Sequence, residues 1–194
     1  MNKRLLVLNA KQLRQGTGYR VQGTVKRNEI YIVLDHVLDT YNIGSIFRLA
    51  DAVAAKKIYL CGGTETPPNP RIKKASINTT EWVEWQYCET AVEAICKLTS
   101  EVRSRRNHKR HLGGVSSVQI VAIEQTAESI QYDKFEYKMP ICLVVGHETD
   151  GVSKEVLEMA DAIVELPMFG VNKSLNVMVS LGIVLYEVIE KTNP

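Results

Sequence analysis

The chain has 194 residues, of which 45% are apolar and 24% charged, a composition typical of one globular domain and unlike that of a disordered or fibrous protein. Its net charge of +2 hides an asymmetry, because residues 1–28 carry seven basic and no acidic side chains, which leaves 17 basic against 22 acidic residues in the remainder. A basic N-terminal arm (residues 1–28) before a domain of residues 29–194 favours a polyanionic partner, although a solvated tail without a partner gives the same pattern.

The periodicity of apolar residues predicts strands and helices that alternate along the chain. In chain order, the predicted elements are strand 30–34, helix 43–54, strand 58–61, a long loop over 62–80, strand 82–87, helix 90–106, strand 118–123, helix 125–131, strand 141–145, helix 153–160, strand 162–166 and helix 174–190. This alternation predicts an α/β fold with a mainly parallel six-stranded sheet flanked by helices.

The spacing of the cysteines and the length of the apolar runs indicate the cellular compartment of the protein. The four cysteines contain no C-x-x-C pair, which argues against a zinc site or a disulfide framework and favours a reducing compartment. No apolar run approaches the roughly 18 residues that a membrane-spanning helix needs. We therefore expect a cytoplasmic protein without a metal or a membrane partner.

Two groups of basic residues fall in segments where a polyanion would bind. One lies in the predicted loop 62–80, and long loops in compact domains are usually functional. The other ends the predicted helix 90–106. The six residues that we expect to contact a polyanion are Arg71, Lys73, Lys74, Arg103, Arg105 and Arg106.

The last predicted helix, 174–190, has apolar side chains around almost its whole circumference. Such a helix is buried on more than one side. In a domain of this size the second cover is expected to be another copy of the chain, which predicts a homodimer.

Two glycine-bearing loops, at residues 146–151 and 166–170, each follow an apolar strand and precede a Ser-Leu-Asn-Val segment at 174–177. Glycine lets the backbone approach a small ligand closely, and open parallel sheets bind ligands at the carboxyl ends of their strands. These loops predict a cofactor site. A Rossmann-type site is not indicated, because no G-x-G-x-x-G follows a predicted strand.

A third polar segment, Asn42-x-Gly44-x-x-x-Arg48, opens the helix after the first strand. Asn42 is predicted to cap that helix, and Gly44 to let a ligand approach. Arg48 lies off the apolar stripe, so it is free to face a site, although an ordinary surface arginine fits the same position.

The three segments together resemble the SpoU family of knotted RNA 2′-O-ribose methyltransferases, within the SPOUT class, over about residues 29–191. The first family motif, N-x-G-x-x-x-R, is matched by Asn42, Gly44 and Arg48. The motifs G-x-E-x-x-G and P-M-x-G-x-x-x-S-L-N-V are matched by Gly146, Glu148, Gly151, Pro167, Met168, Gly170, Ser174, Leu175, Asn176 and Val177.

This resemblance implies a deep trefoil knot in the C-terminal part, S-adenosylmethionine as cofactor, a homodimer, and methyl transfer to a ribose 2′-hydroxyl. RNA would be the partner, with tRNA preferred over rRNA because only a short basic arm precedes the domain. By resemblance, the cofactor-binding residues would be Gly146, Leu166, Met168, Leu175 and Glu148. Glu148 also fits a role in bracing its own loop through backbone N–H groups.

The resemblance places Arg48 at the reacting hydroxyl, either as the base or as a bidentate clamp on a neighbouring phosphate. Asn42, Ser174 and Asn176 would position polar groups of the substrate. Two positions depart from the family pattern: Lys173, where an acidic residue is common, and Met178, where a small polar residue is common.

Two other functions remain open from the sequence: a non-catalytic RNA-binding homologue and a knotted enzyme that methylates a base nitrogen. A serine or cysteine hydrolase is disfavoured, because the chain has no G-x-S-x-G elbow.

Overall fold

The computed structural model describes residues 26–107 and 117–192, and the predicted basic arm lies almost wholly outside this part of the chain. The described elements are β1 (Asn28–Asp35), α2 (Thr40–Ala52), β2 (Ala55–Cys61), α3 (Pro70–Ser76), η2 (Thr79–Glu81, a 3₁₀ helix), β3 (Trp85–Cys88), α4 (Ala91–Asn107), β4 (Gln119–Ile123), β5 (Ile130–Gln131), β6 (Ile141–Val145), α5 (Lys154–Met159), β7 (Ala162–Glu165) and α6 (Val177–Thr192).

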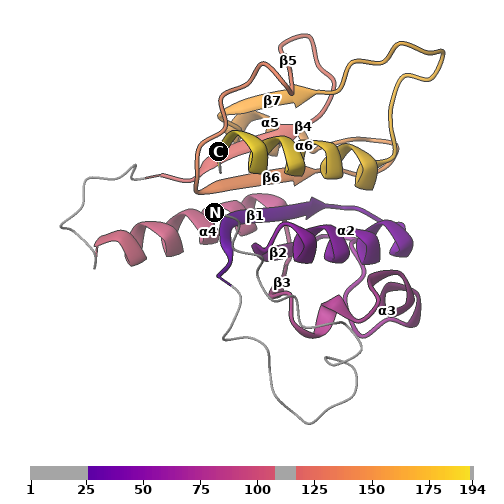
Figure 1. Cartoon of the computed structure of the whole chain (residues 1–194), viewed down its shortest axis with the longest axis vertical. Helices are drawn as coiled ribbons and strands as arrows, with labels where there is room; N and C mark the ends of the chain where they lie inside the picture. Colours follow the sequence, from indigo (N-terminus) through magenta and orange to yellow (C-terminus); the bar gives the residue numbers. More distant parts are fainter. Residues whose placement is uncertain (1–25, 108–116, 193–194) are drawn as a thin grey trace, which may run out of the picture.

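The strands form one parallel sheet in the order β3-β2-β1-β6-β4-β7-β5, shown in Figure 1. The predicted parallel sheet flanked by helices is confirmed, although the described residues form seven strands rather than six. The chain winds outward from β1 to β3 and then returns to the other side of β1, so the winding direction reverses between β1 and β6. Ligands of open parallel sheets bind at such a reversal, beyond the carboxyl ends of the strands. The knot stays a prediction.

Both faces of the sheet are covered, which explains the continuous apolar runs in the strands. In β1, Ile30, Ile32 and Leu34 belong to the core beneath α2, α3 and α6, whereas Tyr31 and Val33 belong to the core beneath α4 and α5. Figure 1 shows α2 and α6 side by side on one face of the sheet. The two helices therefore bring the first and third motifs to the same side of the molecule.

Three segments differ from their predicted structure. Residues 62–80 are not one loop, because Asn69 caps α3 by accepting from the N–H groups of Arg71 (2.8 Å) and Ile72 (3.2 Å) and proline occupies the first helical position. Residues 125–131 form turns and the short strand β5, not a helix. The strand predicted at 82–87 starts only at Trp85, because η2 precedes it.

Helix α6 is buried on one side within the chain, not all round. The buried side packs into the core through Leu181, Val184, Leu185 and Val188. The exposed apolar face of α6 consists of Val179 (39% exposed), Ile183 (36%) and Tyr186 (56%). Among the described residues, no helix combines the length and apolar character that crossing a bilayer requires.

Candidate active site

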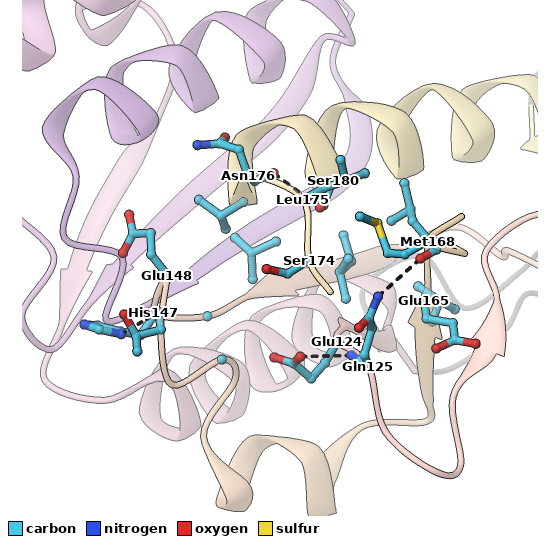
Figure 2. A pocket seen from close by; sticks show the side chains of 18 residues that line it. Glu124, Gln125, His147, Glu148, Glu165, Met168, Ser174, Leu175, Asn176 and Ser180 are labelled. Atoms are coloured by element: carbon cyan, nitrogen blue, oxygen red, sulfur yellow. Dashed lines mark hydrogen bonds between the residues drawn. The ribbon is translucent and has the colours of Figure 1, made fainter. Parts of the chain in front are cut away.

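A pocket of about 370 Å³ lies at the carboxyl ends of β4, β6 and β7 and beside the start of α6 (Figure 2). Its volume falls within the range of about 300–1,000 Å³ typical of small-molecule sites. All seven site residues expected in and beside the second and third motifs line it: Gly146, Glu148, Leu166, Met168, Ser174, Leu175 and Asn176. The structure therefore gathers all the expected cofactor residues around one cavity.

The loop after β6 owes its shape to two glycines that touch each other. A Cβ at position 146 would lie 2.1 Å from the carbonyl carbon and oxygen of Gly151, and Gly151 itself has φ +74°. The loop closes with paired backbone bonds, in which His147 N donates to Gly151 O (3.0 Å) and Gly151 N donates to His147 O (2.9 Å). A side chain at either glycine would force this wall of the pocket apart.

Two residues of the pocket wall, Glu124 and Gln125, were missed by sequence reasoning. The Glu124 carboxylate accepts from the N–H of Val152 (2.9 Å), and Gln125 Nε2 donates to Leu166 O (3.4 Å), the bond drawn in Figure 2. They tie the end of β4 to the loops after β6 and β7. Glu124 and Gln125 directly follow an apolar strand, and this position at its carboxyl end was the signal that could have found them. The incorrect helix prediction for 125–131 obscured it.

A chain of hydrogen bonds joins the three motifs. The Glu148 carboxylate accepts from Asn42 Nδ2 (3.0 Å) and from the N–H groups of Leu38 (3.1 Å) and Asp39 (3.0 Å). Asn176 Nδ2 in turn donates to Asn42 Oδ1 (3.0 Å). Asn176 Oδ1 also accepts from the first N–H groups of α6. Glu148 thus accepts backbone N–H bonds as expected, but those of Leu38 and Asp39 in the loop after β1 rather than those of its own loop, so it ties the two loops together.

Two details of the first motif were predicted incorrectly. Helix α2 is capped by Asp39, whose carboxylate accepts from the N–H groups of Tyr41 and Asn42, so Asn42 is not the cap. Gly44 does not admit a ligand but allows α2 to pack against α3, because a Cβ there would lie 2.6 Å from Ala75 Cβ and 2.7 Å from Ile72 O. Both residues serve the assembly of the site.

Hydrogen bonding controls the charge of Glu148. Partial burial tends to raise the pKa of this carboxyl, but the hydrogen bonds from Asn42 and from the N–H groups of Leu38 and Asp39 outweigh burial and leave the pKa below its ordinary value. The ionised carboxylate therefore stabilises the folded state. A group with a lowered folded-state pKa gives its full stabilisation above its unfolded-state pKa and loses it as the pH falls through the folded-state pKa.

Glu148→Gln should consequently lower the free energy of unfolding near neutral pH, by about 1 kcal/mol, because it replaces charge-assisted bonds with weaker ones. The difference from the wild type should shrink as the pH falls and Glu148 becomes protonated. Urea denaturation over a pH series measures it, with exposed Glu128→Gln as the matched control. An equal difference at all pH values would show that the lost charge is not the cause.

Arg48 is exposed on α2 and does not line the pocket within this chain. It lies one helical turn after Gly44, and residues four apart share a helix face. Because Gly44 faces α3, Arg48 lies on the side of α2 that packs against α3. The structure thus confirms that Arg48 is outside the core stripe and leaves its catalytic role a prediction.

The two expected basic groups lie at opposite ends of the strands. Arg71, Lys73 and Lys74 are exposed on α3, near the carboxyl ends of the strands. Arg103 and Arg105 are exposed near the end of α4, a helix that packs against β1, β2 and β3 and that ends, in Figure 1, on the side of the amino ends of the strands. Arg105 pairs with Glu101 at 3.6 Å. The side chain of Arg106 lies outside the described part. A single protomer therefore does not join the two groups into one surface beside the pocket.

The sequence is similar over most of its length to proteins named as RNA methyltransferases. Residues 29–186 match the profile of the SpoU rRNA Methylase family. A tRNA (guanosine(18)-2′-O)-methyltransferase of Aquifex aeolicus is 33% identical over 165 residues, covering 84% of this chain and 69% of the relative. A 23S rRNA (guanosine-2′-O-)-methyltransferase of Ralstonia nicotianae is 30% identical over 162 residues, covering 84% and 59%. The chain thus spans about two thirds or less of the length of these relatives.

Solved structures agree with this relationship. An AdoMet-bound rRNA methyltransferase from Sinorhizobium meliloti superposes with a TM-score of 0.71 at 29% identity, covering 87% of this chain and 59% of that one. The TrmH/SpoU tRNA modifying enzyme of A. aeolicus gives a TM-score of 0.69 at 28% identity, covering 86% and 76%. With its three motifs joined around one pocket and its sequence matching the family profile from residue 29 to residue 186, the chain belongs to the SpoU methylase family.

Proposed function

We propose that the protein transfers a methyl group from S-adenosylmethionine to a ribose 2′-hydroxyl of tRNA or rRNA. The observation that carries the proposal is the hydrogen-bonded chain Glu148–Asn42–Asn176, which fixes all three motifs beside a pocket of cofactor size. Membership of the family supports it, as do relatives named as tRNA and 23S rRNA 2′-O-methyltransferases.

The residues that line the pocket fit S-adenosylmethionine. This molecule combines a flat adenine with charged amino, carboxyl and sulfonium groups, so its site needs apolar walls as well as polar groups. Leu166, Met168 and Leu175 would hold its apolar part, and Glu124 and Gln125 keep the polar wall in place. When bound, S-adenosylmethionine supplies a methyl group that is already activated for transfer.

The chain's own residues then have to orient the acceptor and manage its proton. The ribose 2′-hydroxyl loses its proton as its oxygen gains the methyl group. A guanidinium is protonated at neutral pH and is a poor base, so we assign Arg48 to clamping a phosphate next to the target ribose through two N–H bonds. The phosphate or a water molecule then takes the proton. Ser174 lines the pocket, and we assign its hydroxyl to bonding the ribose.

The direct cellular test is mass spectrometry of tRNA and rRNA from a strain that lacks the gene. We expect one 2′-O-methylated nucleotide to disappear and to return when the wild-type chain, but not the Arg48→Ala variant, is supplied. RNA modification that is identical with and without the gene would contradict the proposal.

We also propose that the protein is a homodimer that buries the exposed apolar face of α6. Val179, Ile183 and Tyr186 form a row of large apolar side chains along the helix, beside Leu175, which is 41% exposed. Such a continuous patch is typical of a protein–protein contact. The face adjoins the pocket, so a partner chain there would also border the site.

Ile183→Glu should convert the dimer to a monomer, because an unpaired charge in an apolar contact is strongly unfavourable. Light scattering at micromolar concentration measures the change, with Glu190→Gln on the same helix as the control. Val184 is unsuitable for this test, since it is fully buried in the core of the chain. A wild-type monomer under these conditions would refute the proposed interface.

A further inference from the structure

A second pocket lies at the edge of the sheet, away from the proposed cofactor site. It is formed by the loop after β2 and by the edge strand β3. Its lining residues are Gly63, Thr64, Glu65, Thr66, Trp85 and Tyr87. The family motifs do not include any of these positions, so the assigned function gives them no role.

Two aromatic side chains dominate this pocket. Trp85 and Tyr87 are two residues apart on β3, so they lie on the same face of the strand. Trp85 is half-buried and packs against the core, whereas Tyr87 is 46% exposed and its hydroxyl donates to Gly62 O at 3.1 Å. The pair therefore gives a fixed aromatic surface that is open to solvent.

Hydrogen bonds connect this pocket to the proposed active site along the carboxyl edge of the sheet. Gly63 N donates to His36 Nδ1 (3.1 Å), and the Thr64 hydroxyl donates to Leu34 O (3.4 Å) at the end of β1. Just beyond, Leu38 binds Glu148 of the cofactor pocket. Strand β3 is three strands from β6, or about 14 Å at the usual strand spacing, so one RNA strand can pass over both pockets.

The wall of the second pocket carries one carboxylate, Glu65, and three exposed cations lie on the adjoining helix α3. Glu65 accepts a hydrogen bond from Asn69, the residue that caps α3, so the pocket wall is joined directly to the first turn of α3. Arg71, Lys73 and Lys74 are exposed on that helix. Cations beside an aromatic surface are the arrangement by which proteins bind single-stranded RNA, with phosphates on the cations and bases stacked on the rings.

We propose that this second pocket binds an unpaired base of the RNA substrate, stacked on Tyr87 and Trp85, with its neighbouring phosphates on α3. The inference rests on the proposed RNA function and adds a requirement to it, that the target lies in a loop or single strand. In a duplex the base faces are stacked on one another and are not available to aromatic side chains.

The test uses the full-length protein with 5-fluorotryptophan at both tryptophans and fluorine NMR. Trp82, whose Nε1 donates to Asp51 at 2.9 Å, serves as the internal control. The probes are a mixed-sequence single-stranded RNA of twelve nucleotides and the duplex of the same sequence. We expect the Trp85 resonance to shift with the single strand and not with the duplex, while the Trp82 resonance stays in place. A Trp85 resonance that does not shift with the single strand, or that shifts equally with both RNAs, would overturn the proposal.

A pair of substitutions at one position separates stacking from other contacts. Tyr87→Leu should weaken single-strand binding by about five- to one-hundred-fold, because the stacking surface is lost, whereas Tyr87→Phe keeps the ring and should bind nearly as the wild type does. If the Tyr87→Leu variant binds RNA as tightly as the wild type does, and the protein still methylates RNA, the base-binding proposal is contradicted. The proposed function would then be unaffected. Absence of RNA methylation by the wild type would instead remove the proposed function.

Discussion

Arg48→Ala should reduce methyl transfer by at least about 100-fold, the usual loss when a positioned catalytic group is removed. S-adenosylmethionine affinity should stay unchanged, since Arg48 does not line the pocket. Stability should also hold, because the side chain is exposed on α2. Single-turnover kinetics with saturating RNA measures the first effect, and calorimetry and thermal melting measure the other two.

Arg48→Lys distinguishes a clamp from a simple positive charge. Lysine keeps the charge but has no planar fork of donors, so a bidentate phosphate clamp predicts a loss close to that of alanine. Lys154→Ala, which removes an exposed charge from α5, is the matched control and should leave turnover unchanged. Near-normal methylation by Arg48→Ala would end the assignment of Arg48 to the reaction.

Gly146→Ala should abolish detectable S-adenosylmethionine binding. The added Cβ would lie 2.1 Å from the carbonyl group of Gly151 and 2.2 Å from Val152 N, and these are backbone atoms that cannot move aside as a side chain does. The loop would have to separate, and a misplacement of about 1 Å in a site costs on the order of 100-fold. Crowding of this kind also destabilises the fold by about 1–3 kcal/mol.

Gly182→Ala is the matched control, because position 182 lies outside both glycine loops and a Cβ there would make only ordinary contacts, 3.4 Å from the side chain of Leu49. Isothermal calorimetry with S-adenosylmethionine and S-adenosylhomocysteine should show binding by the wild type and Gly182→Ala but not by Gly146→Ala. Thermal melting checks that Gly146→Ala is still folded at the assay temperature. Full affinity in that variant would show that the cofactor does not depend on this loop.

Most strands of the sheet can be predicted from the sequence, because parallel strands that are buried on both faces are continuous apolar runs. Residues 30–34 and 141–145 are continuous apolar runs, as expected of strands with helices over both faces, and both are strands in the structure. Helix α3 was missed because the prolines at positions 67, 68 and 70 suggested a loop, although Asn69 and Pro70 are also the signals that start a helix.

The parts of the site that escaped prediction depend on long-range contacts. Asp39 and Asn42 are both suitable caps, and only the three-dimensional position of Glu148 shows that Asn42 binds across to the second motif. Glu124 matters because it holds Val152, 28 residues further along the chain, a contact that no local pattern encodes. The sequence motifs identify many of the residues that line the pocket, but not Glu124 and Gln125, nor the bond between Asn42 and Asn176.

The most direct test of the proposed activity is methyl transfer by the purified protein in vitro. The protein is incubated with S-adenosylmethionine carrying an isotopically labelled methyl group and with tRNA and rRNA purified from a strain that lacks the gene, and the RNA is then digested and analysed by mass spectrometry. We expect the label in a 2′-O-methyl ribose, at a phosphodiester bond that resists alkaline cleavage, and no label with Gly146→Ala. Label on a base, or no transfer to either RNA, would contradict the proposed function.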